Sequence, residues 1–225
     1  MAWIAGSPMC MVKSSRVSWP ELVDALVKSG DPECRQERPC PDAEGLVIER
    51  TQRWLERAVI GLNLCPFAGP VFTQKRIRYV VCRAVSEGEL LDALAAELAF
   101  LQSADPTLVE TTLVIHPDVL RDFLEFNQFL GEAQALLRRV RLEGILQIAS
   151  FHPRYCFAGA EADDITNYSN RSPYPILHLL RESSVAAVVS GAADADRIVN
   201  RNLETLRQLG KKGWDALGIP TAGEP

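Results

Sequence analysis

Apolar residues recur at helical spacing from Ile48 to Leu62. Pro66 interrupts this pattern, which therefore predicts an amphipathic helix ending near Leu64. The next segment, residues 77–84, is rich in β-branched and aromatic side chains. That composition predicts a strand.

A helix, a strand, a second helix and a third strand follow in order. Ser86 and Glu89 form a capping box, which predicts a helix with one leucine-lined face. Residues 109–115 are predicted as a strand, and apolar positions continue at helical spacing up to Leu137. Residues 144–151 complete the series as a strand.

This alternation of strands and helices with short links is typical of a parallel sheet, because crossover helices return the chain to the same edge. We therefore predict an α/β fold: a single domain over residues 46–215 with a small, mostly parallel sheet flanked by helices. Residues 1–45 are rich in proline and glycine and are predicted to be an irregular, partly disordered extension, and residues 216–225 a tail.

Two more helices are expected near the end of the chain. Ser172 and Pro173 resemble an N-cap and a first helical position, which predicts a helix up to about Ser184. Asp194 is expected to cap a last helix that closes at Gly210.

Composition excludes several classes of protein. The chain has 225 residues, 47% of them hydrophobic, enough for one core. Its net charge of −5 and pI near 5.3 disfavour nucleic acid and anionic membranes as partners. No apolar run approaches the roughly 18 residues that cross a bilayer. We find no secretory signal and no C-x-x-C pair, and expect a cytoplasmic protein with six reduced cysteines.

A phrase of apolar strand followed by His-Pro occurs twice, ending at His116 and at His152. If the two strands are parallel, both histidines emerge at the carboxyl edge of one sheet, where open α/β sheets bind ligands. They are candidate acid/base groups. The alternative is that each imidazole only caps a strand end.

The segment after His152 is long and irregular, and its aromatic residues are expected to hold it as an ordered cover over the strand ends. It offers polar side chains to a ligand: Asp163, Asp164, Asn167, Asn170 and Arg171. Asp164 is the candidate that assists the histidines, while Asn167, Asn170 and Arg171 are candidate substrate-binding residues. The alternative is that these side chains make local turns.

Arg171 directly precedes the helix expected at Ser172. Helix N-termini favour anions, and a guanidinium adds a bidentate partner, so an acidic or phosphorylated small molecule fits this position. A salt bridge from Arg171 to Asp163 or Asp164 is the competing interpretation.

A divalent metal is a cofactor that we consider but do not favour. His116 and His152 are candidate ligands, and His178 and Glu182, four residues apart on the predicted helix, are further ones. A polar helix face is usually solvated, however, which argues against the second pair.

Cys65 is a candidate nucleophile. At the carboxyl end of a predicted helix the macrodipole disfavours its thiolate, so packing in the core is the preferred interpretation.

Four phrases together resemble a known bacterial family, domain of unknown function 1415. They are N-L-C-P-F at 63–67, T-T-L-V-I-H-P at 111–117, Q-I-A-S-F-H-P at 147–153 and N-R-S-P-Y-P-I-L-H-L-L-R-E at 170–182. The resemblance covers roughly residues 51–214 and implies a common structure, but no reaction, cofactor or catalytic set.

Two functional hypotheses remain. The first is a small enzyme acting on an anionic metabolite through His116, His152 and Asp164, with Asn170 and Arg171 holding the anion. The second is a binding or interaction module without turnover. The sequence indicates neither a substrate nor an oligomeric state.

Overall fold

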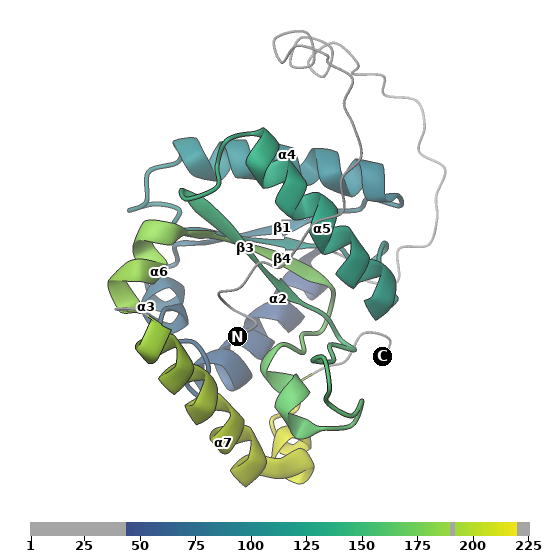
Figure 1. Ribbon diagram of the computed structural model, residues 1–225, viewed down its shortest axis with the longest axis vertical. Coiled ribbons are helices and arrows are strands. Elements are labelled where there is room, and N and C mark those ends of the chain that lie inside the picture. The colour runs from purple at the N-terminus through teal and green to yellow at the C-terminus, as the bar shows by residue number, and fades with distance from the viewer. Residues whose placement is uncertain (1–43, 190–191, 220–225) are drawn as a thin grey trace, which may run out of the picture.

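The computed structural model describes residues 44–189 and 192–219. Helices alternate with the four strands of one sheet (Figure 1). The elements are α2 (Glu44–Trp54), the π-helix η1 (Leu55–Ile60), α3 (Ala68–Thr73), β1 (Ile77–Val81), α4 (Glu87–Ser103), β2 (Thr111–Ile115), α5 (Phe123–Arg139), β3 (Leu146–Phe151), the 3-10 helix η2 (Ile165–Ser169), β4 (Ile176–Arg181), α6 (Glu182–Val188) and α7 (Ala192–Ala216).

The sheet is mixed, whereas the sequence predicted a mostly parallel one. Its strand order is β1-β2-β4-β3; β1 is parallel to β2, and β4 lies antiparallel between β2 and β3. In the register, Ile176 is paired with both Ile115 and Phe151. Because β2 and β3 are each antiparallel to β4, they still point in the same direction, so their carboxyl ends share one edge.

The helix predicted from Ser172 to about Ser184 is wrong. Residues Ile176–Arg181 form strand β4, and the short helix α6 begins only at Glu182. All six side chains of β4 are buried, because helices cover both faces of this inner strand. A strand buried on both sides shows no alternation of apolar and polar residues, so its pattern resembles that of a buried helix.

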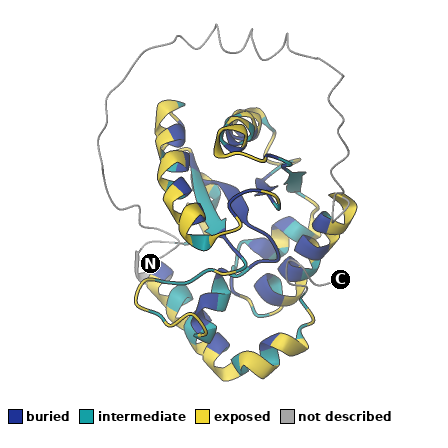
Figure 2. Ribbon diagram, turned by 90° about the vertical axis from the view of Figure 1, so that its right-hand side faces the viewer, coloured by how far each residue is buried: buried dark blue, intermediate teal, exposed yellow. Residues whose placement is uncertain are grey.

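Two layers of helices enclose the sheet (Figure 1). The leucines of α4 and the inner side of α5 pack on one face, against residues such as Val114 and Leu177. On the other face α2, η1 and α7 contribute to a second cluster, in which the rings of Trp54 and Phe151 meet edge to face at 5.0 Å. Figure 2 shows that these helices bury one side and expose the other, as amphipathic sequences require.

The predicted N-cap of α4 is present, and the Glu89 side chain reaches back to the residue before the N-cap Ser86. The hydroxyl of Ser86 accepts the backbone N–H of Glu89 at 3.3 Å, and the carboxylate of Glu89 accepts the N–H of Val85 at 2.8 Å. The last predicted helix is longer than expected, because α7 continues past a kink at Gly210, whose φ is 62°.

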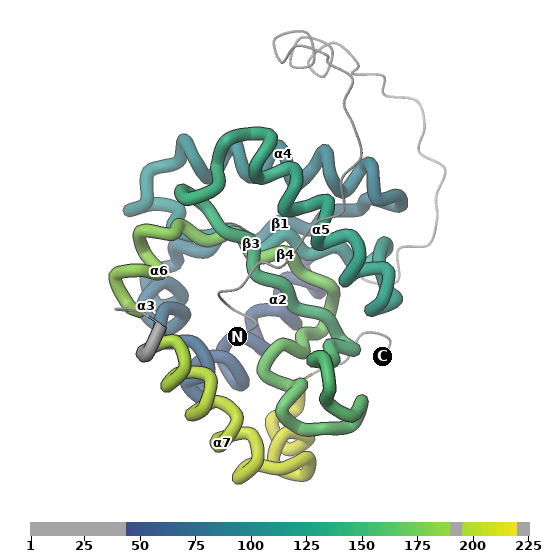
Figure 3. Tube along the Cα trace, in the orientation of Figure 1, coloured from purple at the N-terminus to yellow at the C-terminus, as the bar shows by residue number. Residues whose placement is uncertain are grey.

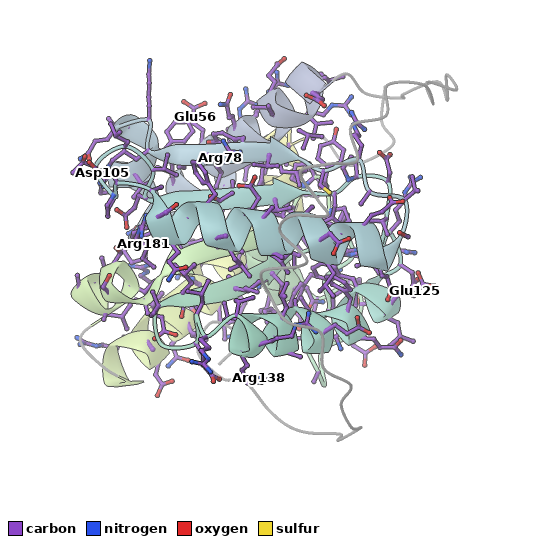
Figure 4. The ribbon with its side chains drawn as sticks, turned by 90° about the horizontal axis from the view of Figure 1, so that it is seen from above. Glu56, Arg78, Asp105, Glu125, Arg138 and Arg181 are labelled. Atoms are coloured by element: carbon purple, nitrogen blue, oxygen red, sulfur yellow. The ribbon has the colours of Figure 1, made fainter. Side chains whose placement is uncertain are left out.

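The two ends of the sheet carry different groups (Figure 4). At one end Arg181, the last residue of β4, donates to the carbonyls of Ala104 at 2.8 Å and Val109 at 3.2 Å. Glu125, in the first turn of α5, marks the opposite end, where β2 and β3 terminate.

The predicted extension falls on residues 1–43, outside the described part, except that Glu44 and Gly45 already belong to α2. Residues 220–225 of the predicted tail also lie outside it. Within the described ranges, no helix has the length and apolarity needed to cross a membrane.

Candidate functional site

His116 and His152 lie at the same edge of the sheet, each directly after the last residue of its strand. Both side chains are fully buried, on the face that α5 covers. Their ring centroids lie 5.8 and 5.1 Å from that of Phe126. The parallel direction of β2 and β3 brings them together, because strands with the same direction end at the same edge.

The backbone occupies three of the four imidazole nitrogens. His116 Nδ1 lies 3.1 Å from the carbonyl oxygen of Val119, and His152 Nε2 lies 3.2 Å from that of Leu120. The N–H of Arg154 donates to His152 Nδ1 at 3.0 Å. His152 is therefore protonated on Nε2. Among the described residues, His116 Nε2 has no hydrogen-bond partner.

Burial keeps both imidazoles neutral near pH 7. Loss of solvation, with a smaller contribution from the neighbouring His152, lowers the pKa of His116 to about 4. Burial also lowers the pKa of His152 to about 4, with a smaller contribution from the Arg154 guanidinium. His152 cannot exchange a proton without breaking a backbone hydrogen bond. His116 retains one unpartnered lone pair.

Asp164 makes its hydrogen bonds within its own loop. It is the N-cap of η2, where its Oδ1 accepts the backbone N–H and the hydroxyl of Thr166, both at 2.8 Å. These bonds lower the pKa of the carboxyl group. Among the described residues, Asp164 makes no hydrogen bond to either histidine.

Figure 3 traces the path of the loop from 154 to 171. Polar side chains hold this loop together. The buried Asn167 accepts the N–H of Phe157 at 3.0 Å and donates to the carbonyl of Glu161 at 2.8 Å. Asn170 donates to the carbonyl of Ser150 at 3.2 Å, which ties the loop to β3. The amide groups of both asparagines are therefore used in ordering the loop.

Arg171 also holds the loop in place, and its guanidinium in addition stacks on an aromatic ring. It donates to the carbonyls of Tyr155 at 3.2 Å and Ala162 at 2.5 Å. Its guanidinium carbon lies 4.2 Å from the ring centroid of Tyr168. Lys211 of α7 approaches the same ring, with Nζ at 5.6 Å from the centroid and 3.2 Å from the hydroxyl oxygen.

We call Arg171, Tyr168 and Lys211 the Arg171–Lys211 cluster. The hydrogen bond to Tyr168 raises the pKa of Lys211, whereas the charge of Arg171 opposes that rise, so the two cations repel each other. Edge-to-face packing of Tyr168 on Trp214, at 5.0 Å, fixes the ring against α7. The sequence analysis missed Lys211. Its only local signal is a basic position on a helix, because its partners lie about 40 residues away in the chain.

His178 does not join the other histidines. It is paired in register with Leu113, so these two side chains lie on the same face of the sheet. His116 comes three residues after Leu113 and therefore points to the opposite face. His178 donates from Nε2 to the hydroxyl of Thr111 at 2.7 Å, which in turn donates to the carbonyl of Leu179.

The predicted pairing of His178 with Glu182 on one helix face is wrong, because His178 lies in β4 and Glu182 begins α6. Among residues 44–189 and 192–219, no three histidine, cysteine or acidic side chains are grouped to hold a metal ion.

Cys65 packs in the turn between η1 and α3, beside the second core cluster. Burial raises the pKa of its thiol, and hydrogen bonds from Phe67 and Ala68 only partly offset this effect. Burial is therefore the main reason that the thiolate is disfavoured.

Residues 46–216 match the model of a family described as "Protein of unknown function (DUF1415)". The chain belongs to this family. Neither the curated proteins nor the solved structures contain a match to it. The matched region contains the four sequence phrases, and the description of the family assigns no activity.

Proposed function

We propose that this DUF1415 protein binds an anionic small molecule, of the phosphate-bearing class, at the Arg171–Lys211 cluster, without turnover. The observation that supports this proposal is that two cations converge on one tyrosine ring. Arg171 stacks on the ring of Tyr168, and Lys211 lies at its hydroxyl group. An oxyanion placed between two like charges relieves their repulsion and accepts charge-assisted hydrogen bonds from both.

Hydrogen-bond donors remain at the cluster for such a ligand. Arg171 uses Nε and one terminal nitrogen for backbone carbonyls, which leaves its other terminal nitrogen. Lys211 gives one of its three N–H donors to Tyr168. Asp215 lies 3.8 Å from Lys211, at the limit of an ion pair between exposed groups, and balances only part of the positive charge.

The hydrogen bonds of the histidines support binding without catalysis. Both nitrogens of His152 are bonded to the backbone. Asp164 is a helix cap. Groups bonded in this way hold the backbone after β2 and β3 in place.

The enzymatic hypothesis retains one supporting observation, the unpartnered Nε2 of the fully buried His116. If a substrate reaches this nitrogen, His116 Nε2 would act as a general base. Nitrogen-15 spectra of the imidazoles test this step. A shift of the His116 Nε2 resonance on adding pyrophosphate supports access to the nitrogen, and an unchanged resonance under saturation excludes it.

Titration calorimetry with pyrophosphate tests the binding proposal itself. Lys211→Gln is expected to weaken binding roughly tenfold, the size of one lost charge-assisted hydrogen bond. Lys212→Gln removes the same charge from the adjacent exposed position and serves as the matched control. Equal losses in the two variants, or no heat of binding with the unaltered protein, would overturn the proposal.

A further inference from the structure

A cavity of about 330 Å³ opens between α6, α7 and the turn that precedes α3. It lies far from the histidines. Arg181, which leads directly into α6, is paired with Leu146 at the start of β3, whereas His152 follows the end of that strand. In Figure 1, α3, α6 and the start of α7 lie together on the side away from the 154–171 loop. The lining residues are Pro66, Val188, Arg197, Ile198 and Arg201.

The polar part of this lining is cationic. Arg197 and Arg201 are four residues apart on α7, so their side chains emerge on the same side of the helix. A terminal nitrogen of Arg201 donates to the carbonyl of Asn63 at 2.6 Å. The neighbouring Asn202 donates to the carbonyl of Leu64 at 2.7 Å. These two bonds fix α7 against the turn and hold the guanidinium of Arg201 at the cavity wall.

The rest of the lining is apolar and comes from three separate segments. Pro66 follows the turn, Val188 ends α6, and Ile198 lies between the two arginines. Val188 is 41% exposed, although it is a large apolar residue. An apolar wall beside two guanidinium groups matches a ligand that has an anionic head and a hydrocarbon chain.

We infer that this cavity binds a short-chain monocarboxylate. A guanidinium presents two parallel N–H groups that match a carboxylate, and the chain would lie on Pro66, Val188 and Ile198. The volume is at the lower end of the range for small-molecule sites, about 300–1,000 Å³, which matches a ligand with a short chain. Among the described residues that line the cavity, none has an aromatic ring on which a nucleobase would stack.

Calorimetry with three probes separates the contributions of head and chain. Hexanoate is expected to bind. Acetate, which lacks the chain, and hexylammonium, which has the opposite charge, are each expected to bind at least about tenfold more weakly. Acetate binding as tightly as hexanoate, or hexylammonium doing so, would contradict the inference.

Variants then locate the site. Arg197→Gln is expected to weaken hexanoate binding roughly tenfold, and Arg207→Gln, an exposed position of the same helix outside the lining, to leave it unchanged. Val188→Trp fills the cavity without altering charge and is expected to abolish binding. Retained binding in Val188→Trp, with an unchanged melting temperature, would overturn the assignment.

The cavity and the Arg171–Lys211 cluster are tested separately. Lys211→Gln is expected to leave hexanoate binding unaltered, and Val188→Trp to leave pyrophosphate binding unaltered. Loss of both ligands in either variant would mean that the two sites are not independent, which would contradict the inference drawn here.

Discussion

The Nε2–H of His152 donates to the carbonyl of Leu120, a residue 32 positions earlier in the chain, at 3.2 Å. Leu120 has a φ of 55°, a left-handed conformation that costs energy for a residue with a branched side chain. The imidazole thus connects the strained turn that follows β2 to the beginning of the loop that follows β3. Its role in the structure is that of a buried cross-link.

His152→Ala is therefore expected to destabilise the protein by roughly 2–4 kcal/mol. It leaves a cavity beside Phe126 and removes the partners of the Leu120 carbonyl and the Arg154 N–H. Urea denaturation followed by circular dichroism measures the loss. Arg154→Ala, which removes an exposed ion pair with Asp122, is the control and should cost much less. Similar losses in both variants would argue against the cross-link.

Acid is expected to destabilise the protein because its three histidines are buried in their neutral form. The pKa is lowered from 6.5 to about 4 for His116 and His152, and to about 3 for His178. As the pH falls, the unfolded chain therefore binds protons before the folded protein does. The free energy of unfolding has its full value above about pH 6.5 and declines toward pH 4. For His116 the full loss is on the order of 3 kcal/mol.

The free energy of unfolding, measured at pH 7.5, 5.5 and 4.5, checks this prediction. Carboxyl groups with lowered pKa values, such as Asp105 and Asp164, contribute only below about pH 4 and so do not explain a decline that starts near pH 6.5. His116→Gln should flatten the pH dependence. A free energy that stays constant from pH 7.5 to 4.5 would be incompatible with neutral buried imidazoles.

Asn167 is expected to control the order of the 154–171 loop. Asn167→Ala removes hydrogen bonds to Phe157 and Glu161 inside a buried environment, at a cost of about 1–3 kcal/mol. Limited proteolysis should then cut the loop faster than in the unaltered protein. Asp163→Ala, at an exposed position of the same loop, should not change the cleavage rate. If both variants are cut equally fast, the asparagine does not hold the loop.

Arg141 offers a stabilising substitution. It follows the C-cap of α5 with a φ of 61°, and the N–H groups of Arg141 and Leu142 bond to the carbonyls of Arg138 and Leu137, which is a Schellman motif. Glycine adopts this conformation without strain, so Arg141→Gly should raise the unfolding free energy by about 0.5–1 kcal/mol. Arg139→Gly, inside the helix, should lower it by about 1 kcal/mol. Thermal unfolding shows whether each substitution raises or lowers the stability of the protein.

Local patterns predicted most of the elements correctly. The capping box at Ser86 located α4, and the segments over 77–84, 109–115 and 144–151 contain β1, β2 and β3. Each of these features depends on residues a few positions apart, such as a hydroxyl three residues from a carboxylate. Short-range hydrogen bonds require particular residues at fixed spacing, and burial of one side produces a regular alternation of apolar and polar residues. Both patterns can be read directly from the sequence.

Strand β4 and the site residues were decided only by the tertiary structure. In Ile176–Arg181 the surroundings bury both sides of the segment, so no period distinguishes a strand from a helix. Sequence indicated that His116 and His152 share an edge, but not that backbone carbonyls occupy their nitrogens. Arg171 and Lys211 meet at Tyr168 because α7 folds back onto η2. Contacts between distant segments depend on how the whole chain packs, and no local pattern encodes them.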